Sequence, residues 1–303
     1  MKKILITGSN GLLGQSLIQL VTSAGRVNLI AGSKGPNRYP YDGGYQYVAL
    51  DISDKAQLKR VVAEQKPDTI INTAAITNVD ICHKERELCW RVNVDAVANL
   101  IEICQSADIH LIHLSTDFVF DGAAGPYAED AAPNPISYYG ESKYAAEKLL
   151  QQSACRWAIL RTILVYGVTA NMSRSNIVLW VKSSLEKGEK IRVVADQWRM
   201  PTLATDLAEA CLLTAKKEAV GVFHISGKDM MTVYDIACQV ADYWQLDSSL
   251  IEPVSSASLG QEAKRPAKTG FILDKAAREL DYQPHSFLEG LQIVEQQLKA
   301  LAV

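Results

Sequence analysis

An apolar run, "KILIT" at 3–7, is followed at once by three glycines, Gly8, Gly11 and Gly14, and then by a helical pattern. Short apolar runs go on alternating with longer helical patterns through the first half of the chain. Strands that are apolar on both faces must be covered on both sides, which is typical of a parallel sheet between helices. The sequence therefore predicts an α/β fold built on a doubly wound parallel sheet.

The glycines stand where a dinucleotide would bind in such a fold. Glycine permits a tight turn and a close approach of the backbone to a pyrophosphate, and the N–H groups at the helix start attract phosphate oxygens. The spacing here is G-x-x-G-x-x-G, and the alternative is a merely structural turn. Because strand, loop and helix occur in the required order, we predict a cofactor site.

The remaining elements predict a second, smaller lobe. In the first half the predicted strands are 3–7, 27–31, 45–50, 68–74, 109–115 and 157–162, and the predicted helices are 11–24, 54–65, 90–107 and 138–152. After Thr162 the pattern predicts helices at 173–186, 204–216, 231–244 and 286–300, strands at 190–194, 221–226 and 250–254, and a loop at 252–270. We predict a dinucleotide-binding domain at 1–165 and a mainly substrate-binding lobe at 166–303, with some segments returning to the first domain.

The 303 residues, 48% hydrophobic and 21% charged, have the composition of an ordinary soluble globular protein without a nucleic-acid partner. The apolar run after two N-terminal lysines is too short for a signal peptide, and no segment has transmembrane length. Six cysteines at irregular spacing predict reduced thiols, so we expect a cytoplasmic protein with no membrane partner. His110 and His113 would lie on opposite faces of a strand, so no metal site is predicted.

The second strand and its loop bear on the choice of cofactor. An acidic residue about twenty positions after the glycines would accept a hydrogen bond from a free ribose 2′-hydroxyl. The window "NLIAGSKGPNR" has no acid, but it offers Ser33, Lys34 and Arg38, which suit a 2′-phosphate. We therefore favour NADPH over NADH; the alternative is that the two cations are only solvated loop charges.

The stretch "SYYGESKYAAEKLL" contains two Tyr-x-x-x-Lys pairs, which helix phase separates. Tyr139 and Lys143 fall in one stripe with apolar residues, whereas Tyr144 and Lys148 share a polar side that should meet water. A neighbouring ammonium favours a tyrosine phenolate, which brings its pKa toward the range useful for proton transfer. Tyr139 is therefore the acid/base candidate.

The run "HLIHLSTDFVFDG" ends a strand with Ser115, Thr116 and Asp117, near the carboxyl edge where such sheets bind ligands. A hydroxyl there can donate a hydrogen bond to a substrate carbonyl. The alternative is a turn or capping role.

Together "TGSNGLLGQ", "NTAAITNVD", "RVNVDAVANL", "LSTDFVFDG", "YGESK" and "LRTILVYG" resemble the extended short-chain dehydrogenase/reductases, and in particular the dTDP-4-dehydrorhamnose reductase family. The likeness continues through "VVADQWRMPTLATDLA", "GVFHISG" and "RPAKTGFILDKAARELDY". It implies a Rossmann-like fold and NAD(P)H-dependent reduction of the 4-keto group of a nucleotide-linked deoxysugar, as in the conversion of dTDP-4-dehydrorhamnose to dTDP-rhamnose.

The resemblance also implies residue roles. Thr116 would hydrogen-bond the keto oxygen, Tyr139 would protonate it, and Lys143 would lower the pKa of Tyr139 and hold the nicotinamide ribose. The cofactor would be lined by Gly8, Asn10, Gly11, Leu12, Leu13, Gly14, Asp51, Ile52, Ala74, Ala75 and Asn93, in addition to Tyr139 and Lys143. The substrate would contact Asp117 and the positions of Phe118 and Leu164, while Arg265 would bind its diphosphate or pack the lobes.

Two positions depart from the family pattern, and they leave the sugar open. The family has tyrosine where this chain has Phe118, and tryptophan where it has Leu164. Two other functions also remain: a nucleotide-sugar epimerase or dehydratase of the same superfamily, and a non-catalytic, NADP-binding regulatory subunit like the methionine adenosyltransferase β subunit. A homodimer is a further expectation.

Overall fold

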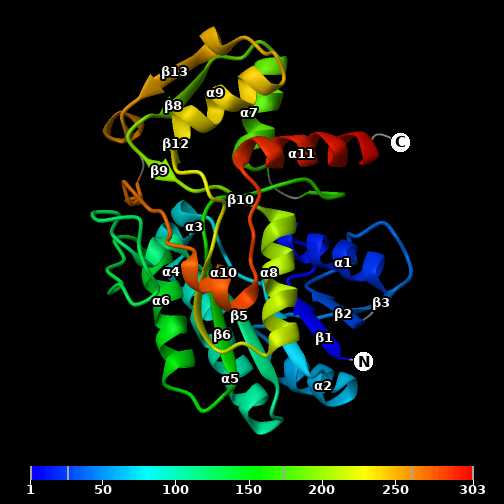
Figure 1. Ribbon diagram of the computed structural model, residues 1–303. Helices are drawn as coiled ribbons and strands as arrows, with labels where there is room; N and C mark the ends of the chain where they lie inside the picture. Colours follow the sequence, from blue (N-terminus) through cyan, green and yellow to red (C-terminus); the bar gives the residue numbers. More distant parts are fainter. Residues whose placement is uncertain (1, 26, 173–174, 261, 302–303) are drawn as a thin grey trace.

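The computed structural model of the chain (Figure 1) describes residues 2–25, 27–172, 175–260 and 262–301. Its centre is a seven-stranded sheet in which every strand pairs parallel to its neighbours. In spatial order the strands are β11 (Gly221–Ile225), β6 (Trp157–Thr162), β5 (His110–Thr116), β4 (Thr69–Asn72), β1 (Lys3–Thr7), β2 (Asn28–Ser33) and β3 (Tyr45–Ala49). The predicted doubly wound parallel sheet is confirmed.

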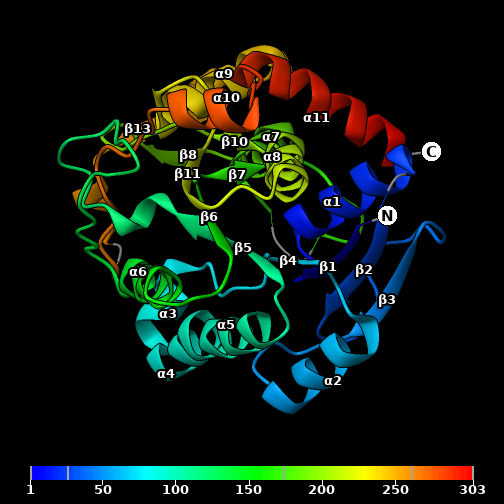
Figure 2. The same cartoon turned by 60° about the horizontal axis from the view of Figure 1, so that its bottom comes forward.

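Helices cover both faces of this sheet (Figure 2). They are α1 (Leu12–Ala24), α2 (Lys55–Gln65), α3 (Val79–Lys84), α4 (Arg86–Trp90), α5 (Ala96–Ser106), α6 (Tyr138–Gln151), α8 (Ala204–Lys217) and α10 (Asp274–Leu280). Alternate strand residues enter two cores: Leu5, Ile70 and Leu111 pack with α2, α5 and α6, whereas Ile6, Ile71 and Ile112 pack with α1 and α8. Because each face of the sheet packs against its own layer of helices, the strands carry apolar residues on both faces.

The later part of the chain forms a lobe above the carboxyl edge of the sheet (Figure 1). It contains α7 (Ile177–Glu186), α9 (Val233–Tyr243), α11 (Phe287–Leu301), the parallel pair β8 (Ile191–Val194) and β13 (Ile251–Val254), and the short strands β7 (Val165–Tyr166), β9 (Trp198–Arg199), β10 (Thr202–Leu203) and β12 (Met231–Thr232). Val178, Val240 and Leu291 belong to its separate apolar core. Strand β11 nevertheless leaves this half of the sequence and joins the main sheet beside β6. The boundary at 165/166 stays a prediction.

Local differences from the predicted elements have identifiable causes. The predicted helix at 90–107 continues back through α4, and a π-helical turn at Arg91–Asp95 separates α4 from α5. The short helices α3 and α10 were not predicted, because six or seven residues give too little periodicity. The predicted loop at 252–270 includes β13 residues and a 3-10 turn at Ser256–Leu259. Residue 261 of that loop and 173–174 of the predicted helix 173–186 lie outside the described residues.

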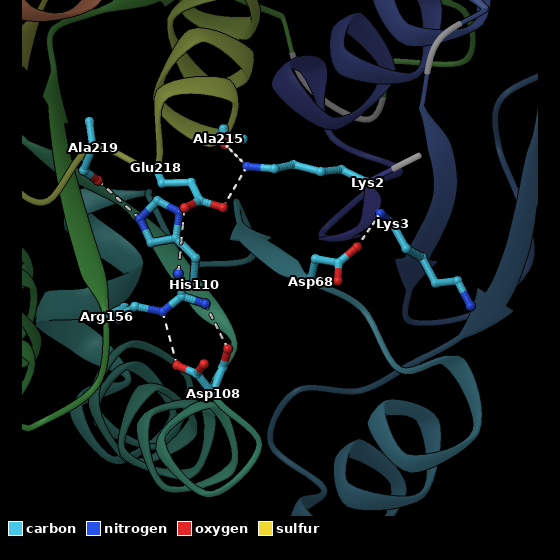
Figure 3. A network of polar contacts seen from close by, with 9 residues as sticks. All are labelled: Lys2, Lys3, Asp68, Asp108, His110, Arg156, Ala215, Glu218 and Ala219. Atoms are coloured by element: carbon cyan, nitrogen blue, oxygen red, sulfur yellow. Dashed lines mark hydrogen bonds and ion pairs between the residues drawn. The ribbon is translucent and has the colours of Figure 1, made fainter.

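Charged side chains join elements at the amino edge of the sheet, away from the glycine loop (Figure 3). Lys2 Nζ donates to the carbonyl of Ala215 and pairs with Glu218 at 2.8 Å. Arg156 pairs with Asp108 at 3.0 Å. The contacts of Lys2 tie the start of β1 to the end of α8, and the Arg156 pair joins the segments that precede β5 and β6. None of the described helices combines the length and apolarity needed to cross a membrane.

Candidate active site

The candidate site lies at the carboxyl edge, where β1, β4 and β5 end. The chain proceeds from β1 to β2 on one side of the sheet and returns to β4 on the other. Ligands of open α/β sheets bind at this kind of switch point. Gly8 follows β1, Ala74 follows β4 and Thr116 ends β5, so residues far apart in sequence meet at one edge.

The glycine loop is tightly packed as well as tightly turned. Gly8 has a φ of 70°, and a Cβ added there would lie 2.7 Å from the backbone nitrogen of Ala74. A Cβ on Gly14 would lie 2.5 Å from the carbonyl oxygen of Gly8. Gly11 is the N-cap of α1, and within the described residues this helix start has no side-chain cap and no acid in its first turn. The N–H groups of Leu12 and Leu13 are therefore placed to bind an anion.

The loop after β2 is fastened to the glycine loop by Asn10. Its Nδ2 donates to the carbonyl of Pro36 at 2.8 Å, and its Oδ1 accepts from the N–H of Arg38 at 2.9 Å. Ser33 is buried at the end of β2. The exposed Lys34 pairs with Asp51 at 3.0 Å, and Asp51 also accepts from the Ser53 hydroxyl at 2.7 Å. All of these predicted residues lie together.

Other predicted cofactor residues have structural contacts. Ala75 is half-buried after β4, and Ile52 is buried behind β3. Asn93 lies in the π-helical turn, where its Oδ1 accepts from the N–H of Ile76 at 2.9 Å and its Nδ2 donates to Ser142 Oγ at 3.1 Å. Asn93 therefore braces the loop after β4 against α6.

The two tyrosine–lysine pairs lie on different sides of helix α6, as the helical periodicity predicts. Ser137 caps the helix by accepting from the N–H of Gly140. Tyr139 and Lys143 are 7% and 2% exposed. In contrast Lys148 is exposed, and its Nζ lies 4.9 Å from the ring centre of the partly buried Tyr144. The second pair is thus a surface cation–π contact.

Thr116 brings the end of β5 to Tyr139. The Thr116 hydroxyl lies close enough to the Tyr139 phenol to lower the pKa of Tyr139 against the larger effect of burial, and Thr116 Oγ1 donates to Asp117 Oδ1 at 3.1 Å. Asp117 is buried, and its Oδ2 accepts from the Thr269 hydroxyl at 2.5 Å. Burial raises the pKa of Asp117, while the nearby charge of Arg199 opposes that rise. The hydroxyl of Thr116, the phenol of Tyr139 and the carboxyl group of Asp117 thus lie close together.

The electrostatics of Tyr139 differ from the expectation. Burial raises the pKa of Tyr139, and the Asp117 charge raises it further. Lys143 does not reverse this, because burial lowers the pKa of Lys143 itself to about 8 and its Nζ lies 3.0 Å from His113 Nε2. The expected lowering of the Tyr139 pKa is therefore wrong for this arrangement. Tyr139 holds its proton at neutral pH.

Of the predicted substrate positions, Phe118 contacts Tyr139 directly, whereas Leu164 and Arg265 have other contacts. The Phe118 ring meets the Tyr139 ring edge to face, with centroids 5.7 Å apart. Leu164 has a φ of 41°, which is unusual for a leucine. Arg265 Nη2 donates to Asp80 Oδ2 at 2.7 Å, so it joins the segment at 262–270 to α3.

Sequence reasoning missed two polar residues near the site, Arg199 and Thr269. Arg199 is 4% exposed, its guanidinium carbon lies 6.0 Å from the Phe118 ring centre, and its Nη2 donates to the carbonyl of Pro266 at 2.8 Å. Both residues reach the site through long-range contacts, and no local spacing in the sequence marks them. An arginine between apolar residues in "QWRMPT" was the one available signal.

Comparisons with known proteins identify relatives of this chain. The family model of the RmlD substrate binding domain matches residues 1–300. A dTDP-4-dehydrorhamnose reductase of Aggregatibacter actinomycetemcomitans is 31% identical, with 96% of this chain and 98% of that protein covered. The methionine adenosyltransferase 2 subunit beta of Xenopus laevis is 32% identical, with 86% of this chain and 77% of that protein covered.

A solved structure extends the likeness to three dimensions. The dTDP-4-dehydrorhamnose reductase of Bacillus anthracis, in complex with NADP, superposes with a TM-score of 0.83 at 30% identity and covers 98% of this chain and 100% of its own. The family match spans nearly the whole sequence. This chain therefore belongs to the RmlD substrate binding domain family, that of the dTDP-4-dehydrorhamnose reductases.

Proposed function

We propose that the protein is an NADPH-dependent reductase of the 4-keto group of a nucleotide-linked deoxysugar, with dTDP-4-dehydrorhamnose as the first substrate to test. The observation that carries the proposal is that the buried Thr116 and Tyr139 lie close together, with Lys143 one helical turn further, at the same sheet edge as the glycine loop. The relatives named dTDP-4-dehydrorhamnose reductase support the choice of substrate.

The residues at the glycine loop fit a dinucleotide. The uncapped start of α1 offers backbone N–H donors for a pyrophosphate, and the absence of a Cβ at Gly8 and Gly14 lets the loop pack closely. The loop after β2, held by Asn10, would take the ribose end. When bound, NADPH would supply the hydride for the reduction.

The chain's own residues would complete the reduction with a proton. Thr116 and Tyr139 would both bind the keto oxygen, which polarises the carbonyl and fixes its orientation. Tyr139 then donates its proton to that oxygen, and its burial ensures that the proton is present at neutral pH. The Lys143 ammonium stabilises the phenolate that remains until Tyr139 is protonated again.

Turnover assays test this function directly. Purified protein with NADPH or NADH and a series of dTDP-4-keto-6-deoxysugars should show loss of the reduced-nicotinamide absorbance with at least one sugar. Because Phe118 and Leu164 depart from the family pattern, other 4-keto sugars should be compared with dTDP-4-dehydrorhamnose. Cofactor binding without turnover of any of these sugars would contradict the proposal.

Cofactor binding without turnover would support a second candidate, a non-catalytic NADP-binding regulatory subunit. The observation that favours it is the 32% identity to a methionine adenosyltransferase 2 subunit beta. A nucleotide-sugar epimerase or dehydratase is a third candidate, which tightly retained NAD in the purified protein would support. Acid extraction of the protein and analysis of the released nucleotide distinguish these two.

The cofactor preference makes a separate prediction about Lys34 and Arg38. Arg38 is exposed beside Asn10, whereas the Lys34 charge is shared with Asp51. We expect Arg38→Ala to raise the Kd for NADPH by about fivefold and Lys34→Ala by less, because an exposed charge-assisted contact contributes about 1 kcal/mol. Fluorescence titrations with NADH serve as the control and should barely change. Unaltered NADPH binding in both variants would refute the assignment of the 2′-phosphate.

A further inference from the structure

A continuous line of buried polar side chains crosses the sheet below the candidate site. Thr7 on β1 is in register with Asn72 on β4, which is in register with His113 on β5. Thr7 Oγ1 lies 2.5 Å from Asn72 Oδ1, and Asn72 Nδ2 lies 3.0 Å from His113 Nδ1. His113 Nε2 lies 3.0 Å from the Nζ of Lys143. The line therefore ends on the lysine proposed to act with Tyr139.

Water has no access to this line. The four residues Thr7, Asn72, His113 and Lys143 are 0%, 1%, 1% and 2% exposed. Burial and the Lys143 charge hold the pKa of His113 well below its usual range, so the ring is neutral. The charged and titratable groups that act on Lys143 come from several elements: Glu147 on α6, Cys82 on α3, Cys89 on α4 and His113 on β5. Glu147 is itself paired with Arg161 on β6.

The neutral ring allows only two proton arrangements. A neutral imidazole has one N–H, so it donates through one nitrogen and accepts through the other. If the Asn72 amide donates to Nδ1, then Nε2 carries the proton and donates to an uncharged Lys143 amine. If the amide carbonyl faces the ring instead, Nδ1 donates to it and Nε2 accepts from a Lys143 ammonium. Thr7 suits both arrangements, because a hydroxyl can donate or accept.

We propose that His113, oriented by Asn72 and Thr7, is a positioning residue that holds the Lys143 Nζ one turn from Tyr139 and reverses its hydrogen bonds when Lys143 changes charge. Each charge state of the lysine then has a partner, although both lie in the protein interior. This matters because an unpaired buried ammonium is costly and would lose its proton. The role in turnover rests on the proposed reductase, whereas the hydrogen-bond reversal does not.

The tautomer of His113 tests the proposal without any substrate. Long-range ¹H–¹⁵N spectra of the full-length protein, recorded from about pH 6 to about pH 10, cover the titration of the lysine. We expect His113 to change from the Nδ1–H to the Nε2–H tautomer as pH rises, and the loss of its signals in His113→Gln assigns them. In Lys143→Met the tautomer should stay fixed. A tautomer that is constant across this range in the unmodified protein would overturn the proposal.

The pH dependence of kcat then tests the consequence for turnover. His113→Leu removes the acceptor of the ammonium, which destabilises the charged form and should move the basic limb of the profile down by about one pH unit. His113→Gln keeps an acceptor and should restore most of that shift. His110→Leu is the matched control, because His110 lies on the same strand and its Nε2 instead contacts the carbonyl of Ala219. Equal pH profiles of kcat for His113→Leu and His110→Leu would overturn the positioning role. Absence of turnover in the unmodified protein would count against the proposed reductase activity alone.

Discussion

Replacing Tyr139 with phenylalanine is expected to lower kcat by about a thousandfold, because the proton donor of the reduction is removed while its ring remains. The Phe118 ring packs against the Tyr139 ring, which the variant keeps, so the pocket should keep its shape. Stopped-flow or steady-state measurements of nicotinamide oxidation check the loss. The Kd for NADPH should change little, which separates lost chemistry from lost cofactor binding.

Tyr144→Phe in the same helix is the matched control. Its hydroxyl belongs to a partly exposed ring beside Lys148, so kcat should stay within about twofold of the unmodified protein. Similar losses in the two variants would mean that the helical periodicity does not identify the catalytic tyrosine.

A third variant, Thr116→Val, should lower kcat less than Tyr139→Phe, because it removes a donor that orients the carbonyl and leaves the proton source intact.

Helix phase could be predicted from the sequence because it depends only on neighbours in the chain. The stripe that contains Tyr139, Lys143, Ala146 and Leu150 is buried along its whole length. The order of strand, glycine loop and helix at the start of the chain is likewise local, and it was found as predicted. These features are fixed by residues three to seven positions apart, which a pattern detects.

The electrostatics of the site could not be predicted in this way. Whether Lys143 lowers or fails to lower the pKa of Tyr139 depends on the burial of both groups and on Asp117, Cys82 and Cys89 from other elements. Burial depends on tertiary packing, and its effect on a buried group can exceed that of one neighbouring charge. The same reason hid Arg199 and Glu147, since a charged residue in a sequence gives no sign that its partner lies on a distant element.

Glu147 makes the second large prediction, on stability. It is fully buried on the inner side of α6, where Oε2 accepts from Arg161 Nη2 at 2.7 Å and Oε1 accepts from the Ser115 hydroxyl at 2.5 Å. Glu147→Leu would leave the Arg161 guanidinium buried without its carboxylate. We expect the free energy of unfolding to fall by about 3–5 kcal/mol, as measured by urea denaturation.

A double variant distinguishes an unpaired charge from a simple packing defect. In Glu147→Leu with Arg161→Met no uncompensated charge remains, so most of the lost stability should return, although both residues are replaced. Glu186→Leu, which breaks the exposed pair with Lys182 on α7, should change stability by less than about 1 kcal/mol. If the double variant instead stays well below the unmodified protein in stability, the buried pair contributes net stability relative to its apolar replacement. In that case the pair would be a structural support of the strand end that carries Ser115 and Thr116, and kcat at a temperature well below unfolding should fall with it.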